Sequence, residues 1–131
     1  MTREFGPQLL GETEKTLQAI LRRALAGTGL DERLWVALRV AAQPDGTALR
    51  HRLADRARFE DAEALVASLE QRGLVADGAP TVEGHAVLER VLTKSAALSG
   101  PIWEGIDDAD AAARALTEVL ARARTVLGKI A

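Results

Sequence analysis

The sequence has no cysteine and no tyrosine, and only 3% of its residues are aromatic. Without cysteine there are no disulfides, thiol nucleophiles, thiol redox sensors or cysteine-bound zinc sites. No apolar run approaches the roughly 20 residues that a membrane-spanning helix needs. The first residues, Met1–Pro7, lack the apolar core of a signal peptide. We therefore expect a soluble, cytoplasmic protein with no membrane partner.

The sequence also lacks the common motifs of enzymes and metal sites. It contains no His-Glu-x-x-His spacing, no Gly-x-Ser-x-Gly elbow and no phosphate-binding loop. It has two histidines. His51 lies among arginines and is better explained as a DNA-facing or solvated residue than as a ligand, and His85 is better explained as a surface or core-edge residue. The acidic run Asp107–Asp110 lacks the glycine and distal glutamate of a calcium loop, and the start of a helix explains it better. We expect no catalytic residues, no bound metal and no cofactor.

The chain as a whole carries no excess of positive charge, because its formal net charge is −2. Any binding to nucleic acid must therefore come from a local basic patch. The length of 131 residues predicts a single domain, and an apolar fraction of 47% is enough to fill its core. The many alanines favour helix. The fold class expected is all-α, with at most a minimal β-hairpin.

The most informative stretch is 47–75, which reads as two helices joined by a tight turn. Apolar residues recur every four positions on the first helix and at i, i+3, i+4 and i+7 on the second. Glu60 and Asp61 are expected in the first turn of the second helix, and Gly73 should end it. The first helix carries four arginines: Arg50, Arg52, Arg56 and Arg58. A DNA-binding helix-turn-helix fits this pattern, and so does an ordinary helical hairpin with a solvated arginine face.

Helices are also expected on both sides of this stretch. The pattern predicts one over 8–26, one capped by Asp31, one capped by Thr81 and broken or kinked at Gly100-Pro101, and a final one whose start carries Asp107, Asp108 and Asp110. The first and last helices carry long apolar stripes. A homodimer in which they interlock with a partner's copies would cover those stripes, although packing on each other within one chain remains the alternative.

The order of these parts resembles the MarR family of bacterial transcription regulators, over nearly the whole chain. Three segments carry the resemblance: Gly29–Arg39, Ser68–Val75 and Thr81–Val91. The last is similar to the Leu-Thr-x-x-Gly segment that begins the family's long fifth helix. The resemblance implies one MarR-like domain over 1–131. A winged helix-turn-helix would occupy 30–80, and dimerisation helices would occupy approximately 8–27 and 82–131.

The resemblance also implies partners and sites. The protein would bind double-stranded DNA as a homodimer, with the 60–72 helix in the major groove, and a small-molecule effector would bind between the dimerisation and DNA-binding parts. The residues expected at DNA are Arg50, His51, Arg52, Arg56, Arg58, Glu60, Asp61 and Glu63. Trp35, Arg39 and Trp103 are candidates for the ligand site because they join flat apolar surface to charge, although packing is the simpler explanation of all three.

Two departures from the family pattern support a different function. Only Ala76–Pro80 separates Val75 from Thr81, so the family's long basic wing is reduced to a turn without Arg or Lys. Four arginines and one aspartate give 47–58 a charge of +3, whereas one arginine and four acids give 59–72 a charge of −3. Carboxylates repel phosphates, although they can accept a hydrogen bond from cytosine. The alternative is a winged-helix dimer that binds no DNA and acts as a ligand-binding or scaffold protein.

Overall fold

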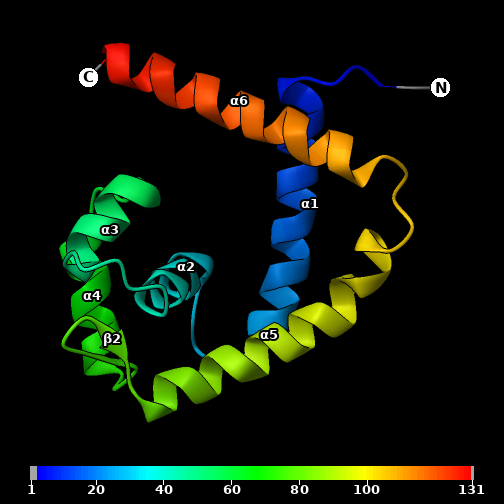
Figure 1. Ribbon diagram of the computed structural model, residues 1–131. Helices are drawn as coiled ribbons and strands as arrows, with labels where there is room; N and C mark the ends of the chain where they lie inside the picture. The colour runs from blue at the N-terminus through cyan, green and yellow to red at the C-terminus, as the bar shows by residue number, and fades with distance from the viewer. Residues whose placement is uncertain (1–2, 131) are drawn as a thin grey trace. The chain divides into compact units, whose positions relative to one another are not determined.

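The computed structural model describes residues 3–130, which form two compact units divided between Gly100 and Pro101. Six helices and one two-stranded antiparallel hairpin lie within the described residues (Figure 1). The predicted fold class, mainly helical with a minimal hairpin, is confirmed. No helix in this range is long and apolar enough to cross a membrane.

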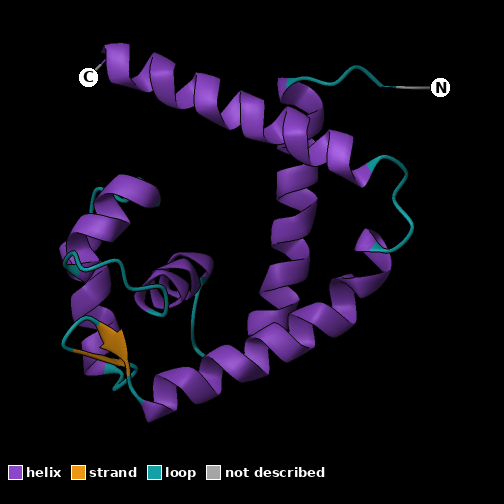
Figure 2. Ribbon diagram, viewed as in Figure 1, coloured by secondary structure: helices purple, strands orange, loops and turns teal. Residues whose placement is uncertain are grey.

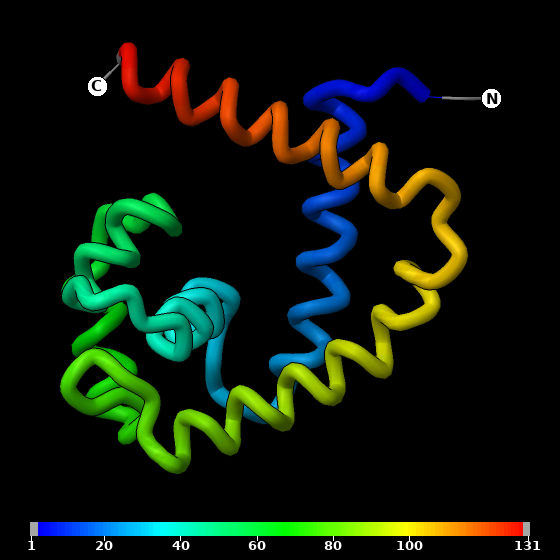
Figure 3. Tube along the Cα trace, viewed as in Figure 1, coloured from blue at the N-terminus to red at the C-terminus, as the bar shows by residue number. Residues whose placement is uncertain are grey.

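The first unit contains four helices, the hairpin and most of a fifth helix. Its elements are α1 (Pro7–Leu25), α2 (Glu32–Ala41), α3 (Leu49–Arg56), α4 (Ala62–Gln71), β1 (Val75–Ala76), β2 (Ala79–Pro80) and α5 (Val82–Trp103). Helix α2 is the central element and packs against α1, α3 and α4 (Figures 1 and 3). The largest of the completely buried side chains come from four different helices: Leu38, Leu53, Leu69 and Val91.

The ends of the helices follow the predicted caps. Asp31 accepts a hydrogen bond from the amide of Leu34 at 2.8 Å and so begins α2. Gly73, with a φ of 75°, ends α4. Its amide donates to the carbonyl of Glu70 and that of Leu74 donates to Leu69, which is the Schellman arrangement. These bonds confirm the predicted helix ends at Asp31 and Gly73. Both ends could be predicted because they depend only on local sequence.

The hairpin confirms the predicted reduction of the wing (Figure 2). Its strands are two residues long, with Val75 opposite Pro80 and Ala76 opposite Ala79. The two residues between them, Asp77 and Gly78, both have positive φ, at 52° and 77°. This is the Asp-Gly two-residue turn whose twist suits antiparallel strands.

Thr81 connects the hairpin to α5 and caps the start of this helix, as predicted from the sequence. Its hydroxyl donates to the carbonyl of Gly73 at 2.6 Å and accepts from the amide of Gly84 at 3.1 Å. Its own amide donates to the carbonyl of Leu74 at 3.0 Å. Helix α5 therefore starts directly against the chain that enters β1. A Cβ atom on Gly84 would lie only 2.1 Å from the oxygen of Leu74, so this approach requires glycine.

The predicted start of α4 is wrong. Helix α4 begins at Ala62, so Glu60 and Asp61 precede its first turn; Asp61 accepts the amide of Leu65 through its carbonyl, while its carboxylate pairs with Arg33.

Of the predicted break or kink at Gly100-Pro101, the break does not occur, because α5 continues through Pro101 to Trp103. A proline inside a helix removes one backbone hydrogen bond without necessarily ending the helix.

The buried face of α5 consists of Gly84, Val87, Leu88 and Val91, whereas Ala86 and Leu92 are exposed. The four buried positions follow the i, i+3, i+4 and i+7 spacing of one helix face.

The second unit contains the end of α5 and helix α6 (Ala109–Ile130). Asp110 lies in the first turn of α6 and Lys129 in its last turn, which suits the helix dipole. A single helix has no means of covering its own apolar stripe. The stripe is exposed along the helix, from Leu116, Val119 and Leu120 to Leu127.

Candidate nucleic-acid interface

Helices α3 and α4 form a helix-turn-helix whose turn spans 57–61. The two helices pack against each other, and each has a leucine buried in the core, Leu53 on α3 and Leu65 on α4. On the outer side of the junction is an open groove of about 660 Å³. Its lining is Arg50, His51, Ala54, Phe59, Glu60, Asp61, Ala62, Glu63 and Ala64. The structure therefore brings five of the eight predicted DNA-contacting residues together at one groove.

Two more of the predicted arginines lie outside the lining of this groove. Arg56, in the last turn of α3, forms an ion pair with Asp45 in the α2–α3 loop. Arg58 lies in the turn between the two helices, with a φ of 57°. Both side chains are exposed, so both remain at the surface of the helix-turn-helix.

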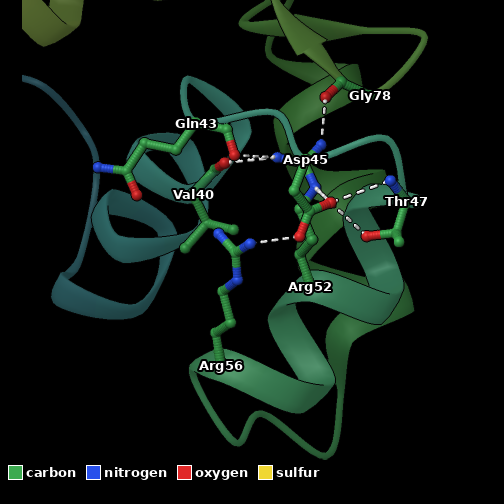
Figure 4. A network of polar contacts seen from close by, with 7 residues as sticks. All are labelled: Val40, Gln43, Asp45, Thr47, Arg52, Arg56 and Gly78. Carbon is green, nitrogen blue, oxygen red and sulfur yellow. Dashed lines mark hydrogen bonds and ion pairs between the residues drawn. The ribbon is translucent and has the colours of Figure 1, made fainter.

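The structure corrects the interpretation of the eighth residue, Arg52. Its side chain is only 4% exposed and lies between α2, α3 and the hairpin (Figure 4). Its Nη1 donates to the carbonyls of Val40 at 2.7 Å and Gln43 at 3.1 Å, and its Nη2 donates to that of Gly78 at 3.2 Å. Arg52 thus supplies donors to the end of α2 and to the hairpin turn. Its guanidinium is committed to the fold, and we remove it from the residues that face DNA.

Asp45 completes this cluster from the α2–α3 loop (Figure 4). Its Oδ1 accepts hydrogen bonds from the hydroxyl of Thr47 at 2.5 Å and from the amide of Thr47 at 2.9 Å. These two bonds hold the pKa of Asp45 below its ordinary value, and Arg56 and Arg52 lower it further, while partial desolvation opposes them. The Nε of Arg52 lies 3.7 Å from the same oxygen. An ionised Asp45 therefore faces both arginines.

Ion pairs bring cations of the neighbouring helices against the acidic segment 59–72. Arg50 on α3 lies 3.9 Å from the carboxylate of Glu63 on α4. Arg33 on α2 pairs with Asp61 and also lies over the ring of Phe59, 5.2 Å from its centroid. Sequence reasoning missed Arg33. It is 28 residues from Asp61, and no local spacing indicates the pairing.

The hairpin offers no cation to a nucleic acid. Its residues Ala76–Pro80 contain no Arg or Lys, and the exposed residue at its turn is Asp77. The positive charge on the surface formed by the helix-turn-helix and the hairpin therefore comes from α3 and the turn that follows it.

The three candidate ligand residues have different environments. Trp35 is 3% exposed and belongs to the core, as the packing explanation predicts. Arg39 is exposed above it, 6.0 Å from its ring centroid. Arg39 lines a groove of about 300 Å³ between α2 and α5, together with Ala42, Gln43, His85, Leu88, Glu89 and Leu92. Trp103 lies in the second unit and is 60% exposed.

No protein-family model and no curated protein sequence matches this chain. Solved structures do match, among them the following two. CouR from Rhodococcus jostii RHA1, bound to p-coumaroyl-CoA, matches with a TM-score of 0.69 and 25% sequence identity over 86% of this chain and 86% of its own. A MarR-family transcriptional regulator from Rhodococcus sp. RHA1 matches with a TM-score of 0.67 and 25% identity over 99% of this chain and 98% of its own.

The order of elements, with a helix-turn-helix followed by a hairpin and a long helix, defines a winged-helix protein. The similar structures narrow this class. The chain is a MarR-like winged-helix protein of the transcriptional-regulator type, with a wing reduced to a two-residue turn. The proteins it resembles are regulators rather than enzymes.

Proposed function

We propose that the protein binds double-stranded DNA as a homodimer and presents α4 to the major groove. The observation that carries this proposal is the groove between α3 and α4, where Arg50, His51 and Glu63 lie together on the outer side of a helix-turn-helix. The second helix of such a unit ordinarily lies in the major groove, with residues near its N-terminus at the base edges. The protein would work in the cytoplasm, where a bacterial chromosome is found.

The residues proposed at DNA divide into two groups. Arg56, Arg58 and His51 are exposed on α3 and the following turn, and we assign them to phosphates. Arg50, Glu60, Asp61 and Glu63 line the groove at the start of α4, where base edges would lie. Since a carboxylate neighbours several of these cations, the net attraction to phosphate is small.

DNA binding should therefore be weak for this family and should depend on Arg56 and Arg58. Replacing both with glutamine is expected to weaken binding to specific and scrambled duplexes alike, because phosphate contacts position a protein without reading sequence. The dependence of log affinity on log salt should become shallower by roughly 1.8, about 0.9 for each phosphate contact. Mobility shifts or fluorescence anisotropy at several salt concentrations measure both quantities.

A matched control removes two charges elsewhere. Arg22 and Arg23 are exposed in the last turn of α1, and replacing both with glutamine changes the net charge equally. This control should leave the salt slope unchanged. The alternative function is a scaffold or ligand-binding dimer, which the absence of cations in the hairpin favours. Negligible binding of all three proteins at low salt would contradict the DNA-binding proposal and favour that alternative.

The exposed stripe of α6 supports the homodimer. Leu116, Val119, Leu120 and Leu127 lie on one face at helical spacing and are 39–50% exposed. Isologous packing against the same helix of a second copy would cover them. We propose that α1, α5 and α6, corresponding to approximately 8–27 and 82–131, form the dimer interface.

Leu120→Glu should convert the dimer to a monomer at micromolar concentration. In the dimer the new carboxylate would be buried against apolar side chains or against the same carboxylate of the second copy. Neither neighbour compensates for the hydration that the charge loses. Light scattering or sedimentation gives the mass directly. Arg114→Glu, an exposed change on the same helix and outside the stripe, is the control. A wild-type protein of monomer mass would exclude this architecture.

We further propose that an anionic effector binds at the groove that contains Arg39. CouR is a regulator of similar structure that binds p-coumaroyl-CoA, an anionic acyl thioester. The groove here combines the Arg39 cation with apolar Leu88 and Leu92, which suits an acyl group attached to a negative charge. Trp35 would support Arg39 through the contact between its ring and the guanidinium. Trp103, an exposed residue of the second unit, stays a separate candidate for ligand contact.

A further inference from the structure

Arg50 and Glu63 form an unusual pair at the centre of the proposed DNA-binding face. They come from the two helices of the helix-turn-helix, and their charged atoms lie 3.9 Å apart. Both side chains are exposed, 57% for Arg50 and 84% for Glu63. An ion pair this exposed contributes little to stability. Its position in the groove therefore requires another explanation.

Of the other two carboxylates in this groove, Glu60 and Asp61, the second has a structural role. Asp61 is held by Arg33, whose guanidinium also lies over Phe59, so this group ties the turn to α2. Glu63 differs, because it lies in the first turn of α4 and projects into solvent. Beyond it on the exposed side are Ala64 and Ala67, whose small side chains allow the helix to approach a surface closely.

We propose that Arg50 and Glu63 together read one C·G base pair in the major groove. Cytosine presents its N4 amino group there as a donor, and the paired guanine presents O6 and N7 as acceptors. Glu63 would accept the proton of cytosine N4, and Arg50 would donate to guanine. The N4 and O6 atoms are hydrogen-bonded to each other, about 2.9 Å apart. The carboxylate of Glu63 and the guanidinium of Arg50 lie 3.9 Å apart, close enough for the two groups to face these neighbouring base atoms together.

The acidic charge would give specificity by rejecting other bases. A carboxylate at this position repels the acceptors of guanine and thymine and meets a single donor group only on cytosine or adenine. The same charge weakens non-specific attraction to phosphates. Glu63 therefore lowers affinity for all DNA while it raises the difference between right and wrong sequences. With no cation on the hairpin, base reading would be concentrated in the groove between α3 and α4.

This inference rests on the proposed DNA binding, and the test separates the two. Wild type, Glu63→Gln and Glu70→Gln are each used to select duplexes from a random pool at low salt. Glu70 is the matched control, because it is an exposed acid on the same helix, near its other end. The wild-type consensus is then resynthesised with N4-methylcytosine at each cytosine, which keeps base pairing and blocks the groove-facing proton.

Wild type and Glu70→Gln should select the same C·G pair in each half-site. Glu63→Gln should lose that preference or shift it toward A·T, since glutamine suits adenine N6 and N7. N4-methylcytosine at that position should weaken wild-type binding roughly 5- to 150-fold and have little effect on Glu63→Gln. Arg50→Gln should relax the preference for guanine in the same pair.

Two results would overturn the inference while the DNA-binding proposal stands. One is an unchanged consensus for Glu63→Gln, and the other is equal loss from N4-methylcytosine in wild type and Glu63→Gln. Enrichment of no sequence by wild type would overturn both. Circular dichroism of each variant ensures that a lost preference is not lost folding, which an exposed substitution at Glu63 should not cause.

Discussion

Gly84→Ala should destabilise the protein by about 3 kcal/mol or more, the upper end of the range for overpacked sites. The added Cβ would lie 2.1 Å from the oxygen of Leu74, well inside contact distance. That carbonyl has little freedom to withdraw, because it accepts the amide of Thr81 at 3.0 Å. Either this hydrogen bond breaks or α5 moves away from β1. The free energy of unfolding from urea titrations, at fixed protein concentration, measures the effect.

Gly11→Ala is the matched control, since it also replaces a glycine within a helix. A Cβ at Gly11 would have no atom within 4 Å. Alanine there should stabilise the protein by about 0.5–1 kcal/mol, the usual difference in helix preference. Equal effects of the two substitutions would contradict the close approach of α5 to Leu74. If Gly84→Ala folds but binds DNA poorly, the displaced α5 is the expected cause.

Arg52→Met should destabilise the protein by about 3 kcal/mol. Methionine retains much of the apolar stem but leaves the carbonyls of Val40, Gln43 and Gly78 without their donor. A buried acceptor that loses its partner costs roughly 1–3 kcal/mol, reduced where water can enter. The loss should also free the hairpin turn from α2. Hydrogen exchange should then speed up at β1 and β2, in addition to the change in unfolding free energy.

Arg56→Met is the control for charge, because Arg56 carries the same group on the same helix. Its ion pair with Asp45 is exposed, so its removal should change stability by about 1 kcal/mol or less. If Arg52→Met changed the free energy of unfolding as little as Arg56→Met does, the buried hydrogen bonds of Arg52 would contribute little to stability. The order should be reversed for DNA affinity. Arg56→Met should lose a phosphate contact and bind DNA more weakly, although its fold is intact.

Much of the fold was predictable from sequence because its signals are local. Asp31 and Gly73 mark helix ends through bonds that span three to five residues. The Asp77-Gly78 dipeptide specifies a tight turn whatever surrounds it. The persistence of α5 beyond Pro101 was not predictable in this way. Proline weakens a helix without excluding it, so the dipeptide alone does not tell whether the helix ends there.

The four arginines of 50–58 show where sequence reasoning about the site ends. Leu49, Arg52 and Leu53 follow helical spacing, so their shared face was readable from the sequence. Yet the rule that arginine faces solvent assigned all four to one charged surface. The structure buries Arg52 because carbonyls from the end of α2 and from the hairpin turn meet at this point.

The sequence by itself determined the helices, their caps, the short turn that replaces the wing and the split of charge between two segments. Only the tertiary structure decided which charges meet. Arg33 pairs with Asp61 and Arg50 with Glu63 because α2, α3 and α4 converge on one core. It also decided that Gly84 must be glycine, since the oxygen of Leu74 reaches it across the junction of hairpin and helix. The physical reason is that caps and turns arise from bonds between near neighbours, whereas these contacts exist only after the core has assembled.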